Sequence, residues 1–319
     1  MATEGKAPRS DAPAVSWIDV DEECAGQRID NFLIARLKGV PKSHVYRILR
    51  SGEVRVNSGR VPASHRVQPG DRIRVPPLRV AERPETLPAP ALRPVVLFED
   101  EFLLAIDKPS GLAVHGGSGV AHGVIEQLRS ARPEARFLEL VHRLDRETSG
   151  VLLLAKKRSS LLAMHEALRE RTADKRYVAG IKGRWRDEMR RVRQSLRKFT
   201  GGDGERRVAV DDDGQSAETV FRLLARNAEF SLVEAQLLTG RTHQIRVHLA
   251  HVGHPILGDE KYGDFPLNKI LRKRGLKRMF LHAVSIRLPH PATGEELEIR
   301  APLAADLAAF RDASIGDVG

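Results

Sequence analysis

Residues 138–155 place a charged segment between two apolar runs. The runs, 138–141 and 151–155, are short and bounded by turn residues, which predicts buried β-strands. Between them the sequence reads His-Arg-Leu-Asp-Arg-Glu-Thr-Ser-Gly, with five polar or charged side chains before a Thr-Ser-Gly turn. Each unpaired charge buried between core strands would cost on the order of several kcal/mol. The segment is therefore expected to line a cleft, with Asp145 as its central carboxylate.

Asp145 is flanked by Arg143 and Arg146, so more than one role is open to it. An aspartate beside arginines is more often part of a structural salt bridge than a catalytic group. Its position between core strands favours the catalytic role. Glu147 could supply the second carboxylate of a glycoside hydrolase. Aromatic residues, which line the sugar clefts of such enzymes, make up only 5% of the chain.

A second candidate stretch is Thr-Gly-Arg-Thr-His-Gln-Ile-Arg-Val-His-Leu, residues 239–249. It predicts a helix with Thr242 as its N-cap and Gly253 just beyond its end. The apolar stripe of this helix is formed by Ile245, Leu249 and Val252. Arg246 lies away from that stripe, so its guanidinium is free to face a cleft.

The sequence favours neither a metal site nor a nucleotide cofactor. His248 and His251 are three residues apart on the predicted helix, but no cysteine or carboxylate completes a set of zinc ligands. The run 211–213 consists of aspartates without the glutamate of a calcium loop, which favours a solvated turn. Gly116 and Gly117 match neither a P-loop nor a dinucleotide fingerprint.

The chain of 319 residues is strongly basic, with 53 Lys and Arg against 42 Asp and Glu and a net charge of +11. This balance favours a nucleic acid as partner over a membrane surface or no specific partner. Cys24 is the single cysteine, so an internal disulfide is impossible and a reducing, cytoplasmic location is expected. No apolar run is long enough to span a membrane. We expect a monomer that binds no membrane.

The composition predicts a small domain and a large domain joined by a linker. Residues 1–15 are small, polar and proline-containing, and are expected to form a disordered tail. Residues 16–78 form the small domain. Residues 79–94 are rich in proline, as in a semi-rigid linker, and residues 95–319 form the large domain.

The small domain is predicted to contain two helices and two strands. Apolar residues recur at helical spacing in 28–38 and again in 41–52, and alternate in 53–57 and 72–75. Its outward-facing residues are basic and include Arg28, Lys42 and Arg47. The helix pair is followed by Gly-Glu-Val-Arg-Val-Asn at 52–57 and by Val-Gln-Pro-Gly-Asp-Arg-Ile at 67–73. Together these features resemble the S-four domain, an RNA-binding domain named after a ribosomal small-subunit protein, and the resemblance implies binding of structured RNA. A basic solvated face on a structural module is the alternative interpretation.

Strands outnumber helices in the large domain, which predicts an α+β fold with a mixed, mainly antiparallel sheet. The dense basic run 182–207, which includes Trp185 and Phe199, is interpreted as an exposed hairpin or arm because so many charges cannot be core. The expected strands are 95–98, 102–106, 138–141, 151–155, 175–179, 219–224, 230–238, 279–288 and 296–299, and the expected helices are 123–130, 159–171 and 302–310.

The two candidate stretches together resemble one known family. His-Arg-Leu-Asp-Arg-Glu-Thr-Ser-Gly and Gly-Arg-Thr-His-Gln-Ile-Arg-Val-His are similar to the two signatures of the RluA-type pseudouridine synthases. The order of S-four domain, linker and catalytic domain is also that of the family. The resemblance covers about residues 16–312, and it implies the pseudouridine synthase fold for the large domain.

The resemblance implies a role for named residues. Asp145 would attack the target uridine, Arg246 would pair with Asp145, and Tyr177 would stack on the base and assist removal of the proton from carbon 5. No cofactor or metal would be needed, because the uracil stays in the pocket until it rejoins the ribose. Arg143 would fill the gap left by the flipped-out uridine. The implied substrate- and RNA-binding residues are Arg143, His142, Leu281, Arg28, Lys42 and Arg47.

The resemblance further implies that the substrate is the ribosomal RNA of the large subunit (23S), in which specific uridines become pseudouridine. Two alternatives stay open at this point. The enzyme could act on another structured RNA such as tRNA, or the protein could be a non-catalytic RNA-binding protein of the S-four type.

Overall fold

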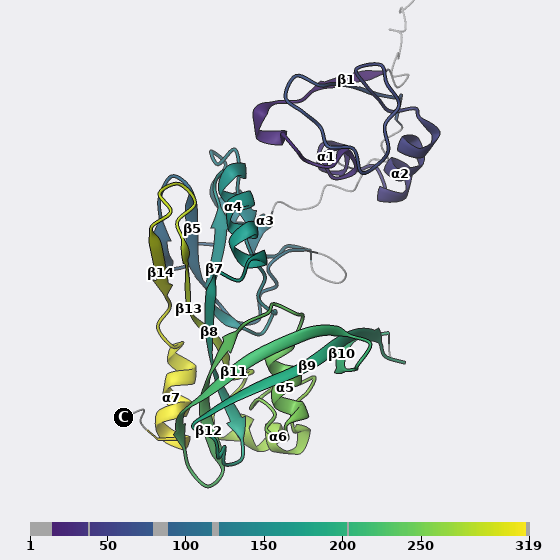
Figure 1. Ribbon diagram of the computed structural model, residues 1–319. Helices are drawn as coiled ribbons and strands as arrows, with labels where there is room; N and C mark the ends of the chain where they lie inside the picture. Colours follow the sequence, from purple (N-terminus) through teal and green to yellow (C-terminus); the bar gives the residue numbers. More distant parts are fainter. Residues whose placement is uncertain (1–14, 38, 79–88, 117–120, 203, 317–319) are drawn as a thin grey trace, which may run out of the picture. The chain divides into compact units, whose positions relative to one another are not determined.

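The computed structural model describes residues 15–37, 39–78, 89–116, 121–202 and 204–316 (Figure 1). The chain divides into two compact units, residues 1–88 and 89–319. Nearly all of the tail predicted for 1–15, and residues 79–88 of the predicted linker, lie outside the described residues.

The N-terminal unit packs two helices against a small antiparallel sheet. The sheet has the order β1 (Ser16–Asp19), β3 (Arg72–Val75), β2 (Arg55–Val56). The predicted helices are confirmed as α1 (Ile29–Arg36) and α2 (Lys42–Ser51), and a short 3-10 helix (Glu22–Cys24) precedes them. Helix α2 ends at Gly52, whose φ of 75° is the left-handed conformation that glycine adopts without strain. The core of this unit includes Ile29, Phe32, Leu33, Val45, Ile48 and Leu49.

The large unit is built on an 11-stranded sheet. The sheet is mixed and mainly antiparallel, which confirms the prediction from the sequence. Its main path runs β10-β9-β11-β12-β8-β13-β7-β5-β4, with β14 paired to β13 and β6 paired to β7. Among the paired strands of the described residues, β13 and β7 alone run parallel to each other. The strands are β4 (Val96–Glu99), β5 (Leu103–Lys108), β6 (Glu139–Leu140), β7 (Ser149–Ala155), β8 (Asp174–Lys182), β9 (Met189–Thr200), β10 (Arg206–Val210), β11 (Gln215–Arg226), β12 (Phe230–Leu237), β13 (Leu281–Pro289) and β14 (Glu296–Arg300).

Helices cover both faces of the central strands. All seven residues of β7 are buried: Leu152 and Leu154 pack in one cluster with α3, whereas Leu153 packs in another with Met164 of α4. Since alternate residues of a strand point to opposite faces, α3 and α4 lie on opposite sides of β7. Helix α5 packs against β9, β10 and β11, and α6 and α7 share a cluster with β12 (Figure 1). These helices are α3 (Val124–Ala131), α4 (Arg158–Arg169), α5 (Gln244–His251), α6 (Phe265–Lys273) and α7 (Ala305–Ser314).

The basic run 182–207 is a hairpin, but it is not a free arm. Strand β9 pairs with β10 on one side and with β11 on the other, so it belongs to the main sheet. Val192 and Leu196 turn into the core, while the arginines next to them in sequence, Arg191, Arg193 and Arg197, are exposed. Trp185, assigned to the arm by its basic surroundings, is only 1% exposed and packs on Phe221 and His254. The prediction of an exposed arm is wrong because alternate residues of a strand face opposite sides, so a strand rich in arginine can still bury the apolar residues on one side.

The predicted N-cap of α5 is also wrong. The capping residue is His243 rather than Thr242, and its φ of 54° lies in the left-handed region. The His243 side chain makes no capping hydrogen bond. The predicted stripe is confirmed in part, because Ile245 and Leu249 are buried, yet Arg246 on the same helix is nearly buried too. The helix is enclosed on several sides, so its burial does not follow one apolar stripe.

Candidate active site

The loop that carries Asp145 joins two strands of the sheet, as the sequence predicted. Strand β6 pairs antiparallel with β7, with Glu139 opposite Ala155. At the start of β7, Gly150 has a φ of 105°, and a Cβ there would lie 2.2 Å from the backbone oxygen of Ala283 on β13. Glycine is therefore needed at this position, because β13 runs parallel to β7 here and approaches its backbone closely. The predicted Thr-Ser-Gly turn is wrong in its place: the turn lies at Arg146 and Glu147, and Ser149 already begins β7.

Lys108 fixes the loop that carries Asp145 through hydrogen bonds to backbone oxygens. Its ammonium group is fully buried and donates to the carbonyl oxygens of Pro109, Leu112 and Arg146, at 2.7, 2.8 and 3.1 Å. Burial lowers the pKa of Lys108 to about 8. At neutral pH the side chain thus remains mostly protonated and can donate all three hydrogen bonds, which fixes the backbone next to Asp145.

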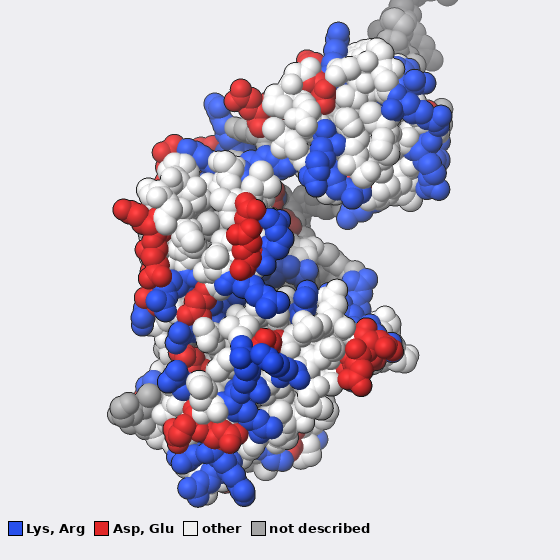
Figure 2. Space-filling model, viewed as in Figure 1, with Lys and Arg blue, Asp and Glu red and all other residues white. Residues whose placement is uncertain are grey.

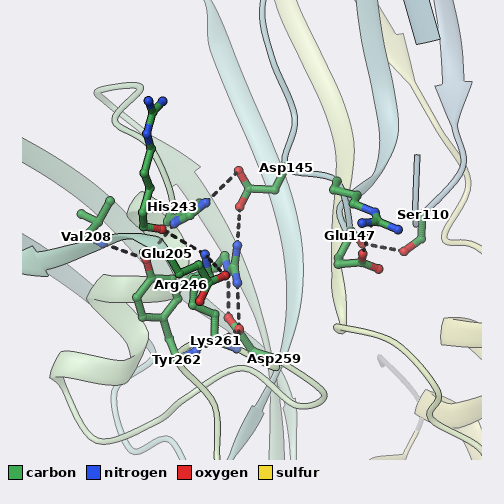
Figure 3. Close-up of polar contacts among 12 residues, drawn as sticks. Ser110, Asp145, Glu147, Glu205, Val208, His243, Arg246, Asp259, Lys261 and Tyr262 are labelled. Atoms are coloured by element: carbon green, nitrogen blue, oxygen red, sulfur yellow. Dashed lines mark hydrogen bonds and ion pairs between the residues drawn. The ribbon is translucent and has the colours of Figure 1, made fainter. Parts of the chain in front are cut away.

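Asp145 is the outer member of a charged chain that leads into the protein (Figure 3). Nη1 of Arg246 donates to Oδ2 of Asp145 at 2.9 Å. The other two nitrogens of that guanidinium, Nε and Nη2, donate to the two oxygens of Asp259, both at 2.8 Å. The side chains of Asp145, Arg246 and Asp259 are 25%, 9% and 1% exposed. The innermost carboxylate therefore orients the guanidinium, which in turn holds the carboxylate that solvent can reach.

The charges of this chain support one another. Burial alone would raise the pKa of Asp259, but hydrogen bonds and charge from Arg246 hold it below its ordinary value. Burial alone would lower the pKa of Arg246, but Asp259 and then Asp145 raise it. Arg246 is therefore a permanent cation, and it holds the Asp145 carboxylate at a fixed position in the cleft.

A cleft of about 1110 Å³ surrounds Asp145. The structure brings together in its lining all the residues of the large domain that the resemblance implied, namely Asp145, Arg246, Tyr177, Arg143, His142 and Leu281. Tyr177 on β8 and Leu281 on β13 come from neighbouring antiparallel strands, in which Tyr177 lies opposite Ala283. Both side chains are almost buried, at 7% and 3% exposed, so they form an apolar wall that a flat base could pack against.

His142 and Arg143 are neighbours in the lining of the cleft but differ in exposure and in charge. Arg143 is exposed, whereas Nε2 of His142 accepts a hydrogen bond from the backbone N–H of Leu153 on β7 at 3.1 Å. Burial, with a contribution from the charge of Lys175, lowers the pKa of His142 to about 4. His142 is consequently neutral at pH 7 and fixes the loop to β7, while Arg143 presents its guanidinium to solvent.

Glu147 does not form a pair of carboxylates with Asp145. Its carboxylate lies 3.5 Å from Nε of Arg146, and its backbone oxygen accepts from the hydroxyl of Ser110 at 2.7 Å. Figure 3 shows Glu147 and Ser110 on the side of the loop away from Arg246. This placement gives no support to the glycoside hydrolase alternative.

The basic residues assigned to the N-terminal unit lie on and next to its helices. Arg28 precedes α1 and pairs with Asp30 at 2.7 Å, and Arg47 on α2 lies 3.3 Å from Glu53. Lys42 is exposed at the start of α2. Two of the three are thus partly neutralised within the unit, although Arg28 and Arg47 remain about half exposed.

Two further hollows are linked to the cleft by shared basic lining residues. A hollow of about 440 Å³ shares Arg169, Lys175 and Arg241 with it, and a third, of about 570 Å³, shares Arg191 with the second. The third is lined by three arginines of β9. Figure 2 shows Lys and Arg gathered over the region of β9 and β11. A chain of phosphates leaving the cleft would meet cations along this surface.

His248 and Asp211, the residues considered above as metal ligands, contact other side chains in the structure. Nδ1 of His248 is 2.9 Å from the hydroxyl of Thr219 in the core, and Asp211 pairs with Arg197 at 2.9 Å. Within the described ranges, no three His, Cys, Asp or Glu residues are arranged to hold a metal ion. In the same ranges, no helix has the length and apolar character needed to cross a membrane.

Sequence reasoning missed four residues of this site: Lys108, His243, Asp259 and Tyr262. Asp259 and Tyr262 lie in the stretch 258–263, whose signal is a group of polar residues bounded by two glycines. His243 lies inside the second candidate stretch, of which Arg246 alone is predicted to face the cleft. Lys108 was inconspicuous because a fully buried lysine is rare.

Comparison with known proteins defines the class. The family described as RNA pseudouridylate synthase matches residues 102–251, and the S4 domain matches residues 27–73. The solved structure of human RNA Pseudouridylate Synthase Domain Containing 4 is 29% identical, covers 68% of this chain and 91% of its own, and superposes with a TM-score of 0.57. The chain belongs to the RNA pseudouridylate synthase family, which confirms the resemblance seen in the sequence.

Individual relatives are more similar still. Ribosomal large subunit pseudouridine synthase C of Pasteurella multocida (strain Pm70) is 53% identical over 296 residues, which are 91% of each chain. The protein of the same name from Escherichia coli (strain K12) is 50% identical over 303 residues, 92% of this chain and 95% of the other. The match thus extends over both units.

Proposed function

We propose that this protein isomerises specific uridines to pseudouridine in the ribosomal RNA of the large subunit, with Asp145 as the nucleophile. The observation that carries the proposal is the partly exposed carboxylate of Asp145, held at 2.9 Å by a buried arginine in a cleft with an apolar wall. The names of the relatives support the ribosomal substrate. A cytoplasmic, monomeric enzyme fits this role.

The reaction balances without an added reactant. The bond between ribose C1′ and N1 of the base breaks, a bond between C1′ and C5 forms, C5 loses a proton and N1 gains one. Asp145 attacks ribose C1′ and displaces N1, the base turns within the cleft, and C5 then bonds to C1′ while the bond to Asp145 breaks and frees the carboxylate. Tyr177 and Leu281 flank the base, and Arg143 fills the gap that the flipped nucleotide leaves in the RNA.

The Tyr177→Phe protein is expected to lose turnover but to retain its affinity for RNA. Burial and the charge of Asp145 raise the pKa of Tyr177, so the group is a neutral phenol that can take the C5 proton only while passing on its own. Phenylalanine keeps the stacking ring and removes that route, so kcat should fall by about 10²- to 10⁴-fold. Single-turnover assays with saturating RNA would measure this; a wild-type rate would contradict the role.

The division of labour between the units is a further part of the proposal. A protein that begins at Ala89 keeps the whole large unit, including Leu92, which packs on its core. It should fold and isomerise uridine at high RNA concentration, with weaker binding and a shallower dependence on salt because fewer phosphates are neutralised. Initial rates against RNA concentration at two salt levels would test this. A folded truncated protein with no activity at saturating RNA would show that residues 1–88 help to build the active complex.

The experiment that tests the function itself is release of tritium from RNA labelled at C5 of uridine. An isomerase releases the label with time, whereas an RNA-binding protein without catalysis releases none. Mapping pseudouridines in ribosomal RNA and tRNA from cells that lack the protein would then identify the substrate. Loss of pseudouridine from tRNA alone would overturn the ribosomal assignment.

A further inference from the structure

His243 lies between the carboxylate of Asp145 and the hydroxyl of Tyr262 (Figure 3). Its Nε2 is 3.8 Å from Oδ1 of Asp145, and its Nδ1 is 2.7 Å from the Tyr262 oxygen. Burial lowers the pKa of His243, and although the charge of Asp145 opposes this effect, the imidazole is neutral at pH 7. A neutral imidazole carries one proton, so one nitrogen donates and the other accepts.

The hydroxyl of Tyr262 determines which nitrogen carries the proton. It accepts a hydrogen bond from the backbone N–H of Val208 on β10 at 2.9 Å, and burial raises the pKa of Tyr262, so the phenol keeps its own proton. Both the phenol O–H and Nδ1 of His243 find a partner if the phenol donates to Nδ1. The imidazole proton then lies on Nε2, the nitrogen that faces Asp145.

Tyr262 is itself held in place from several sides. Its backbone N–H donates to Oδ1 of Asp259 at 3.0 Å, and the Arg246 guanidinium lies 5.0 Å from the centre of its ring. The same two residues form the charged chain behind Asp145. His243 meanwhile has a φ of 54°, a conformation that is uncommon outside glycine and often accompanies function. The surroundings therefore fix both the place and the tautomer of this imidazole.

We propose that His243 is a positioning residue for the isomerisation, whose Nε2–H directs Oδ1 of Asp145 toward the flipped uridine. Arg246 holds Oδ2, so Oδ1 is the oxygen left for the reaction. The separation of 3.8 Å is too long for a hydrogen bond, and such contacts often tighten only when substrate binds. The assignment rests on the proposed role of Asp145.

Two replacements of His243 test whether a hydrogen-bond donor is needed at the position of Nε2 or whether any side chain that fills the space is sufficient. In His243→Gln the side-chain amide reaches about as far as Nε2, whereas in His243→Asn it reaches only as far as Nδ1, and asparagine tolerates the left-handed backbone. We expect His243→Asn to lower kcat by about 10²-fold and His243→Gln to stay within about tenfold of wild type, since small misplacements of a reacting group cost about this much. KM for RNA should change little in either.

Tyr262→Phe provides an independent test, because it keeps the ring but frees the imidazole to change tautomer. Its kcat should fall by about tenfold with KM unchanged, a loss similar to that caused by other small errors of orientation. His254→Gln is the matched control: this histidine bonds the backbone oxygen of Lys182 outside the cleft and should leave kcat unchanged. Thermal unfolding would confirm that each variant is folded.

The outcomes distinguish this inference from the proposed function. Equal kcat values for His243→Asn, His243→Gln and wild type, or a loss confined to KM, would overturn the positioning role while leaving the isomerase intact. Absence of tritium release by the wild-type protein from ribosomal RNA would instead overturn the proposed function.

Discussion

The Asp145→Asn protein is expected to lose isomerisation while it keeps its fold and its affinity for RNA. Asparagine has the shape of aspartate but cannot act as the nucleophile, so kcat should fall by at least about 10⁴-fold, as in other enzymes deprived of such a group. Arg246 keeps its two hydrogen bonds to Asp259, so the free energy of unfolding should change by only about 1 kcal/mol. RNA affinity should stay within about tenfold, because phosphate contacts are spread over the basic surface.

Tritium release, RNA-binding titrations and urea denaturation of the same preparation would measure the three quantities. A suitable control is Glu147→Gln, since Glu147 points away from Asp145 and pairs with Arg146 on the solvent side. That change should leave turnover nearly intact. Isomerisation above background by purified Asp145→Asn protein would remove Asp145 from the role of nucleophile.

The sequence was sufficient for the fold class and for the segments that carry the cleft. Short apolar runs around residues 138–155 predict two buried strands because strand burial depends on local pattern. The second is confirmed as β7, which is buried throughout, whereas the first is reduced to β6, with only two half-buried residues. The sheet itself was foreseen from the excess of strands over helices. The order of its strands, with β8 and β13 adjacent at the cleft, depends on contacts distant in sequence that local patterns do not determine.

The site could be predicted only where its residues lie within recognisable stretches. Asp145 and Arg246 are 101 residues apart, and their pairing followed from the family resemblance rather than from spacing. Asp259 carried no such mark: a buried carboxylate looks like a surface one in a sequence, and only the tertiary fold shows that it orients Arg246. Thr242 was expected to cap α5 because threonine is a common N-cap, but the left-handed His243 takes that position instead.

The buried pair of Arg246 and Asp259 also makes stability depend on pH. The pKa of Asp259 is lowered in the folded protein, so its contribution is fully present above the pKa of an unfolded aspartate, about 3.9, and is lost as the pH falls through the lower folded value. In an Arg246→Met protein the cation is gone, and only the backbone N–H groups of Lys261 and Tyr262 then oppose burial, which is the largest influence on the pKa of Asp259. Its folded pKa should then exceed the unfolded one, so that stability decreases as the pH rises.

The Arg246→Met protein is expected to lose both activity and stability. Asp259 is 1% exposed, and leaving such a charge without its partner typically costs about 3–5 kcal/mol. Asp145 loses its 2.9 Å contact as well, so turnover should fall by at least about 10²-fold. Urea denaturation at pH 5, 6, 7 and 8 should show the largest destabilisation at the highest pH, because protonation relieves the unpaired carboxylate.

Adding Asp259→Asn to this variant separates the two losses. The double variant buries no unpaired charge, so much of the lost stability should return and the pH dependence should flatten, as expected when both partners of an ion pair are replaced. Turnover should not return, because nothing then holds Oδ2 of Asp145 or keeps a cation beside it. Recovery of activity together with stability would show that Arg246 serves the fold alone and that Asp145 needs no fixed cation to react.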